Sequence, residues 1–170
     1  RRYHELGGRL EPILDSIARI HSMGFWLEVV TLVVPGFNDS QRELEALAGF
    51  LSSISPDIPW HVTAFYSDYK MTGPRDTTAA MLERAASIGR AAGLRYVYAG
   101  NLPGGAGELE NTNCPNCGAL LVERYGFEVL QNRLTADGTC PYCQWAIPGY
   151  WRSGARRVRE NRGMLHKRCG

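Results

Sequence analysis

The chain has 170 residues, of which 44% are hydrophobic and 21% are charged, and its formal net charge is +2. This composition excludes a largely disordered chain, and the length suffices for one core plus a small module. The longest apolar run, around residues 25–35, is far shorter than the roughly 20 residues of a transmembrane helix. Because no secretion signal opens the sequence, we expect a cytoplasmic protein.

The first half of the chain alternates between helix and strand patterns. Apolar side chains recur at helical spacing from Leu10 to Ala18. The continuous β-branched run that follows, over residues 25–34, predicts a strand covered on both faces, as in parallel sheets. Ser40 and Glu43 then form a capping box, which predicts a helix from there to Ile54.

The same alternation continues towards residue 100. We expect a strand over 60–66, a helix over 76–92 that ends at Gly93, and a third strand over 94–99. The resulting order αβαβαβ, with short links, predicts an α/β fold with a parallel sheet and right-handed crossovers. Three parallel strands would leave bare edges, so we expect further strands upstream of Arg1.

The chain divides into two parts with different secondary-structure patterns. A glycine-rich linker near residue 105 separates the α/β part, residues 1–104, from a module of short strands, residues 105–151. Residues 151–170 carry 7 Lys/Arg and one Glu, whereas residues 1–150 carry 12 Lys/Arg and 16 Asp/Glu. We expect residues 152–170 to be a flexible basic tail. The alternative is a nucleic-acid contact through the tail, but a solvated chain end is favoured.

Cysteines are confined to the last third of the chain. Cys114 and Cys117 form one Cys-x2-Cys pair and Cys140 and Cys143 another, with 22 residues between the pairs. Two such pairs can bring four thiolates to one point and hold Zn²⁺ tetrahedrally; iron in the same cage is the alternative. Two disulfides or four free thiols are less favoured, and Cys169 is expected to be a spare thiol.

The residues that follow each pair predict unequal turns. Gly118 can take the positive φ that such a turn favours. Gln144 stands at the equivalent place, so we expect a less regular second turn.

Two predicted strand ends carry polar residues, and ligands of α/β folds bind at the carboxyl ends of parallel strands. After the first strand come Asn38, Asp39 and Ser40, although helix capping alone explains the last two. After the second strand, Tyr66 opens a cluster with more polar groups than a simple turn needs; the others are Asp68, Tyr69 and Lys70. No nucleophile–base pair can be identified, so hydrolase chemistry is unsupported.

Several segments together resemble one family: WLEVVTLVVPGFNDS, SPDIPWHVTAFYSDYKM, AGLRYVYAGNLPG, NTNCPNCGALLVER, DGTCPYC and IPGYW. Their order and spacing are similar to the radical SAM enzymes of the AmmeMemoRadiSam system, which are related to the pyruvate formate-lyase activating enzymes. The resemblance covers nearly the whole chain up to Trp151. It implies the C-terminal half of a partial (β/α)6 barrel followed by a zinc-ribbon or rubredoxin-like module.

The resemblance also implies a chemistry. In the family, a Cys-x3-Cys-x2-Cys loop holds a [4Fe–4S] cluster that cleaves S-adenosylmethionine to a 5′-deoxyadenosyl radical. By resemblance, Pro35, Gly36 and Asn38 lie beside the adenosine part of S-adenosylmethionine, with Tyr66 as a further contact. Tyr66 replaces a histidine that is common in the family and cannot act as a cation in its place.

This chain contains no Cys-x3-Cys-x2-Cys motif. We therefore expect a C-terminal fragment that is inactive alone, with the missing N-terminal half of the barrel as its partner, and with an unknown protein or small molecule as substrate. The alternatives are a zinc-ribbon module that binds nucleic acid or protein, and a rubredoxin-like electron-transfer module.

Overall fold

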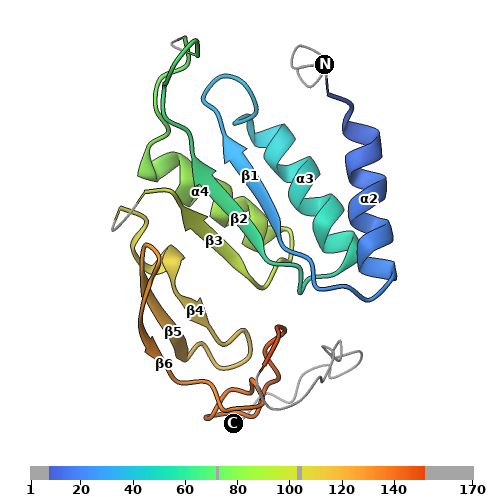
Figure 1. Cartoon of the computed structure of the whole chain (residues 1–170), viewed down its shortest axis with the longest axis vertical. Coiled ribbons are helices and arrows are strands. Elements are labelled where there is room, and N and C mark those ends of the chain that lie inside the picture. Colours follow the sequence, from blue (N-terminus) through green and yellow to red (C-terminus); the bar gives the residue numbers. More distant parts are fainter. Residues whose placement is uncertain (1–7, 72, 103–104, 152–170) are drawn as a thin grey trace.

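The computed structural model describes residues 8–71, 73–102 and 105–151. Figure 1 shows a parallel sheet with its helices above a smaller antiparallel sheet. The predicted mixed α/β class is therefore confirmed. The basic tail predicted over 152–170 lies outside the described residues.

The parallel sheet consists of β1 (Val29–Val33), β2 (Trp60–Ala64) and β3 (Val97–Gly100), in the order β1-β2-β3. The register pairs residues 30, 61 and 98 across the three strands. Strand β2 is central, and β1 has a free edge among the described residues. The predicted parallel arrangement is thus correct, although each strand is shorter than its apolar run.

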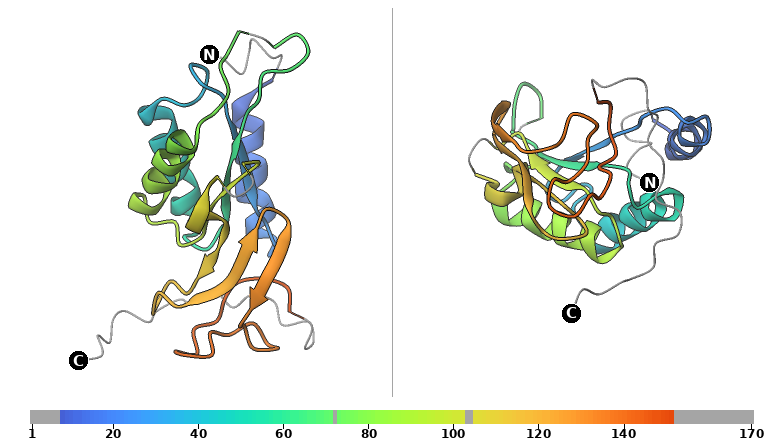
Figure 2. Two further views of the ribbon diagram at one scale, coloured as in Figure 1. Left: turned by 90° about the vertical axis from the view of Figure 1, so that its left-hand side faces the viewer. Right: turned by 90° about the horizontal axis from the view of Figure 1, so that it is seen from below.

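Three helices alternate with these strands: α2 (Leu10–Ser22), α3 (Gln41–Ile54) and α4 (Ala79–Ala91). Figure 2 shows α3 and α4 on one face of the sheet. Side chains that alternate along the strands point to these helices and are buried, and they meet the apolar stripes of α3 and α4. The fully buried members of this core include Val33, Leu44, Leu51, Trp60, Val62 and Leu82. Among the described residues, no helix combines the length and the hydrophobicity of a transmembrane span.

The opposite face of the parallel sheet is open. Val30 and Leu32 of β1 point to this side and are 65% and 48% exposed. The prediction that this strand is covered on both faces is therefore wrong for the described chain, because α3 and α4 cover one face only. Helix α2 lies beyond the free edge of β1 and has no buried residue (Figure 1).

Local signals at the helix ends are borne out. The Ser40 side chain accepts a hydrogen bond from the Glu43 N–H and donates one to the Glu43 carboxylate, which forms the start of α3. Gly93 follows α4 with φ at +98°, a conformation that glycine adopts without a Cβ clash.

The second sheet is antiparallel and contains β4 (Thr112–Asn113), β5 (Leu120–Tyr125) and β6 (Glu128–Asn132). A short 3₁₀ helix, η1 (Gly107–Glu110), joins it to β3 and packs Leu109 against the larger core. The core of this module includes a residue from the first part of the chain: Tyr96, just before β3, packs with Leu121, Ile147, Cys114 and Cys140.

Candidate metal centre and strand-end site

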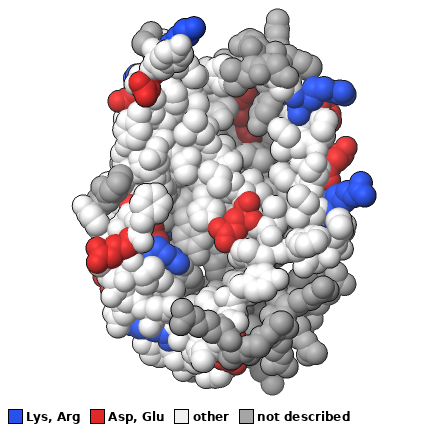
Figure 3. Space-filling view, in the orientation of Figure 1, with Lys and Arg blue, Asp and Glu red and all other residues white. Residues whose placement is uncertain are grey.

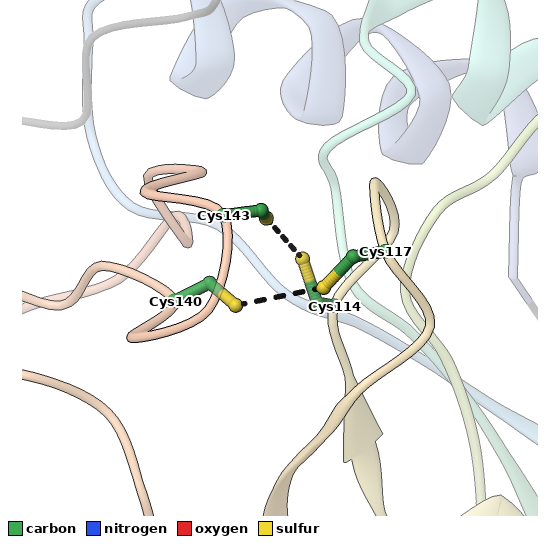
Figure 4. Close-up of side chains that lie close together, drawn as sticks. All are labelled: Cys114, Cys117, Cys140 and Cys143. Atoms are coloured by element: carbon green, nitrogen blue, oxygen red, sulfur yellow. Dashed lines mark hydrogen bonds between the residues drawn. The ribbon is translucent and has the colours of Figure 1, made fainter. Parts of the chain in front are cut away.

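The four cysteines of the module converge. Their Sγ atoms all lie within 4.8 Å of one another, with Cys114 Sγ 3.5 Å from Cys143 Sγ and Cys117 Sγ 3.7 Å from Cys140 Sγ (Figure 4). A tetrahedral ion with sulfur bonds of about 2.3 Å places its ligand atoms about 3.8 Å apart. The thiol positions therefore fit a single S4-coordinated metal ion.

Both Cys-x2-Cys turns have the same backbone geometry. In the first, the N–H of Gly118 donates to the Cys114 carbonyl over 2.9 Å; in the second, the N–H of Gln144 donates to the Cys140 carbonyl over 2.9 Å. Gly118 has φ at +75° and Gln144 has φ at +62°. The expectation of an irregular second turn is thus wrong, because Gln144 adopts the left-handed conformation at the steric cost that glycine avoids.

The thiols differ in their tendency to ionise. Burial raises the pKa of Cys114 to about 12. Burial also opposes ionisation of Cys143, but hydrogen bonds from the Asn116 side chain and the Trp145 backbone N–H favour the thiolate and lower its pKa to about 6. A cation at this position would favour the deprotonated form of every thiol, since metals bind thiolates.

The residues at the end of β1 form a closed loop. The Asn38 amide donates to the Leu32 carbonyl over 2.9 Å, and its Oδ1 accepts from the Val34 N–H over 2.7 Å. Pro35 is buried within this loop, and Gly36 is exposed at its tip with φ at +71°. The Asn38 side chain therefore holds the loop together through its own backbone.

The neighbouring strand ends lie at the same edge of the sheet. Tyr66, after β2, donates its hydroxyl to the Asn101 carbonyl over 2.8 Å, and the Asn101 amide donates to the Ala64 carbonyl over 2.8 Å. Tyr66 is 44% exposed. Pro35, Gly36, Asn38 and Tyr66 thus share the carboxyl edge of the parallel sheet, which points away from strands β5 and β6 of the module (Figure 1).

Sequence reasoning missed a second polar cluster, on the open face of the sheet. His61 Nε2 lies 2.7 Å from Glu28 Oε2, and the His61 ring stacks on Tyr98 with 5.1 Å between the ring centroids. The Tyr98 hydroxyl lies 3.0 Å from Thr112 Oγ1, and the Arg124 guanidinium lies 5.9 Å from the Tyr98 ring centre. Strand alternation places His61 on this face, but the sequence carries no signal that these five residues meet.

One curated protein gives a sequence match. Over 119 residues, 69% of this chain, the sequence is 43% identical to the uncharacterized protein MJ0808 of Methanocaldococcus jannaschii. The match covers 35% of that protein, so this chain spans about a third of the length of its relative. No protein-family model matches the chain. No solved structure matches it either.

Proposed function

We propose that this chain is the C-terminal part of a radical SAM enzyme of the AmmeMemoRadiSam type, in which further strands continue the parallel sheet from β1. The observation that supports further strands is the edge of β1, which is unpaired among the described residues and lies beside the open face of the sheet; the radical SAM type rests on the sequence resemblance. A continuous apolar strand with an unpaired edge is an aggregation hazard that proteins normally cover.

Helix α2 supports the same proposal. It lies past the edge of β1, and its exposed apolar residues are Leu10, Ile13 and Ile20, with Met23 just after its end. A helix in a βα barrel packs over two adjacent strands, whereas here only Ile17 of α2 packs against the core of the sheet, α3 and α4. A strand from the remainder of the protein, paired with β1, would lie under α2. The greater length of the M. jannaschii relative leaves room for such a portion.

The carboxyl edge of the sheet is the proposed contact with S-adenosylmethionine. Gly36 offers a tip without a side chain, the Asn38 bonds hold the loop at a fixed position, and Tyr66 presents an exposed ring anchored by its hydroxyl. An iron–sulfur cluster bound elsewhere in the complete enzyme would supply the electron for cleavage of the cofactor. Alone, this chain would bind S-adenosylmethionine weakly and produce no 5′-deoxyadenosine.

The experiment for this proposal uses the M. jannaschii relative at full length. Outside the matched 119 residues, its sequence should contain Cys-x3-Cys-x2-Cys. After anaerobic reconstitution with iron and sulfide, and with dithionite as the electron donor, the protein should cleave S-adenosylmethionine to methionine and 5′-deoxyadenosine, measured by chromatography. A relative without the motif, or a reconstituted protein that leaves S-adenosylmethionine intact, would refute the proposal.

For the module we propose one structural Zn²⁺ on Cys114, Cys117, Cys140 and Cys143. The four thiols and their backbone turns support closed S4 coordination, which leaves no open position for a substrate. Elemental analysis of protein purified from zinc- and iron-containing medium should give one zinc per chain. A red protein with one iron would instead support the rubredoxin-like alternative.

A nucleic-acid role for the module has less support. The described part of the module, residues 105–151, carries five Asp/Glu and two Arg. Phosphate backbones are bound by basic surfaces, so this acidic module offers little for them. A mobility assay at low salt should therefore show no binding that depends on the module.

A further inference from the structure

A cavity of about 660 Å³ lies between the open face of the parallel sheet and the cysteine module. Its volume is in the range of about 300–1,000 Å³ that is typical of small-molecule sites. The sheet contributes His61 and Tyr98 to the lining, the residue before β1 contributes Glu28, and the module contributes Arg124. Figure 3 shows this side of the molecule as a hollowed face that is largely uncharged, with isolated acidic and basic groups.

Arg124 is the one Lys or Arg among the lining residues, and the two carboxylates there, Glu28 and Glu110, are each held by hydrogen bonds or an ion pair. One guanidinium nitrogen, Nη1, donates to Thr112 Oγ1 over 2.8 Å and to the Glu110 carbonyl over 3.3 Å, and these two bonds hold the side chain in place. No carboxylate of the described residues lies within 4.0 Å of the guanidinium. The Glu110 carboxylate is instead used by the Gly126 N–H, over 2.9 Å. Arg124 therefore keeps donors that can bind an anion.

His61 supplies a second polar group with a fixed orientation. Its Nε2 faces Glu28 Oε2, and its ring stacks on Tyr98 at an interplanar angle of 27°. When Nε2 donates to the carboxylate, Nδ1 carries the lone pair and accepts a hydrogen bond. Trp26 donates its indole N–H to the other Glu28 oxygen over 2.8 Å, so the carboxylate is itself held on both sides.

The rest of the lining is rich in aromatic side chains. Trp26, from the segment before β1, and Trp151, from the module, border the cavity and are partly buried, whereas Phe127 and Tyr150 lie at its rim and are largely exposed. Apolar walls with a few convergent polar groups are the pattern of a small-molecule site rather than of a solvated surface.

We infer that this cavity binds a small organic anion, a carboxylate or a phosphate, through Arg124, and that His61 accepts a hydrogen bond from a hydroxyl or amine of the same ligand. The cysteine module is then part of the binding site, because it contributes Arg124. The inference does not depend on the radical SAM proposal, since every residue named belongs to the described chain.

The test uses the full metal-loaded chain and four probes: benzoate, 4-hydroxybenzoate, phenyl phosphate and the uncharged 4-hydroxybenzamide. Chemical-shift titration should show saturable binding of the anions, with shifts at His61, Tyr98 and Arg124, and weaker binding of the amide. The two anion classes are separated by comparing benzoate with phenyl phosphate. Failure of every anion to bind at millimolar concentration, or binding equal to that of the amide, would overturn the inference.

Variants assign the roles. Arg124→Gln should weaken anion binding about tenfold, because a hydrogen bond to a charged group is lost. Arg90→Gln, on the exposed end of α4, is the matched control and should bind like the parent chain. Arg124→Lys retains the charge and should retain the preference for anion over amide, which separates lost binding from lost folding.

His61→Phe completes the set. It should reduce the affinity for 4-hydroxybenzoate more than the affinity for benzoate, which has no hydroxyl to donate. Equal effects on the two probes would remove His61 from the site, and unchanged binding by Arg124→Gln in a folded, metal-loaded protein would refute the anion contact.

Discussion

The Thr77 hydroxyl donates a hydrogen bond to the Val33 carbonyl over 2.5 Å, and in this way joins the segment before α4 to the last residue of β1. The same oxygen accepts from the Phe65 N–H over 3.0 Å, just beyond β2. One buried hydroxyl thus holds two strand ends at the carboxyl edge, where the proposed S-adenosylmethionine contacts lie.

Replacement of this hydroxyl by a methyl group should destabilise the fold. Thr77→Val keeps the shape of the side chain but leaves the Val33 carbonyl and the Phe65 N–H unpaired in a buried place, at a cost of about 2 kcal/mol. Urea unfolding followed by circular dichroism measures the loss. Thr78→Val is the control, since Thr78 is exposed and its side chain makes no capping bond; equal stabilities of the two variants would contradict the role of Thr77.

A close contact between α4 and β2 makes Gly89 sensitive to substitution. A Cβ at this position would lie 2.7 Å from Cε3 of Trp60, a ring that is fully buried. We expect Gly89→Ala to cost about 1–3 kcal/mol through overpacking. In α3, Gly49 has no atom within 4 Å of such a Cβ, so Gly49→Ala should stabilise the protein by about 0.5–1 kcal/mol. Thermal unfolding of both variants should show shifts of opposite sign.

Substitution of the residue that follows each Cys-x2-Cys pair should change the rate of metal loss in opposite directions at the two turns. Gln144 has φ at +62°, so Gln144→Gly should relieve about 1 kcal/mol of strain and slow metal transfer to a chelator. Gly118→Gln places a side chain at φ +75° and should accelerate that transfer. Transfer to a colorimetric chelator gives both rates. If Gln144→Gly lost its metal faster than the parent chain, strain would not be the deciding factor.

Removal of the metal should disorder the module and leave the parallel sheet folded. Cys114 and Cys140, one from each turn, are buried in a small core with Leu121 and Ile147, and so small a core depends on the metal for much of its stability. The Trp145 ring, 5.4 Å from the Arg95 guanidinium, should report the change in fluorescence, while Trp60 stays buried. A Trp145→Phe variant should lose the fluorescence change, and full unfolding of the chain by chelator would contradict the prediction.

Tyr96 should make the free energy of unfolding decrease at alkaline pH. Burial raises the pKa of Tyr96 well above its usual value, and its hydroxyl makes no hydrogen bond of full geometry among the described residues, although the Trp145 indole N–H opposes the rise. Because the unfolded chain releases this proton near pH 10 and the folded chain does not, the stability should fall as the pH rises above about 10.

Tyr96→Phe tests this pH dependence. It removes the unpaired hydroxyl, so it should be neutral or stabilising at pH 7 and should flatten the alkaline loss of stability. Tyr69→Phe, at a site that is 82% exposed, should leave the alkaline profile as it is. A Tyr96→Phe protein that is as sensitive to base as the parent chain would assign the effect to another group.

Local patterns predicted much of the architecture, because they act over a few residues. The Ser40–Glu43 cap, the end of α4 at Gly93 and the pairing of the Cys-x2-Cys motifs all depend on short spacings. The cluster around His61 depends on three strands and the module at once. Alternation within β2 places His61 on a face, but only the register with Tyr98 and the turn of the module towards the sheet bring Arg124 near it.

The open face of β1 was mispredicted for a related reason. A continuous apolar run indicates that both faces of a strand are buried in the complete protein. It does not indicate which segment or chain covers each face. The regular turn at Gln144 was not predicted because the preference for glycine at a positive φ is a statistical average, and single non-glycine residues also adopt this conformation. The closely similar hydrogen bonds of the two cysteine turns outweigh the preference for glycine at one of them.

Tyr96 belongs by sequence to the parallel sheet and by packing to the cysteine module. A peptide excised at residue 105 would expose Leu121, Val122 and Ile147 where that ring now lies, and would tend to aggregate even when loaded with metal. A gene fusion that transferred the module alone would therefore need a side chain in place of Tyr96. We expect the module to be inherited together with β3, the strand that follows Tyr96.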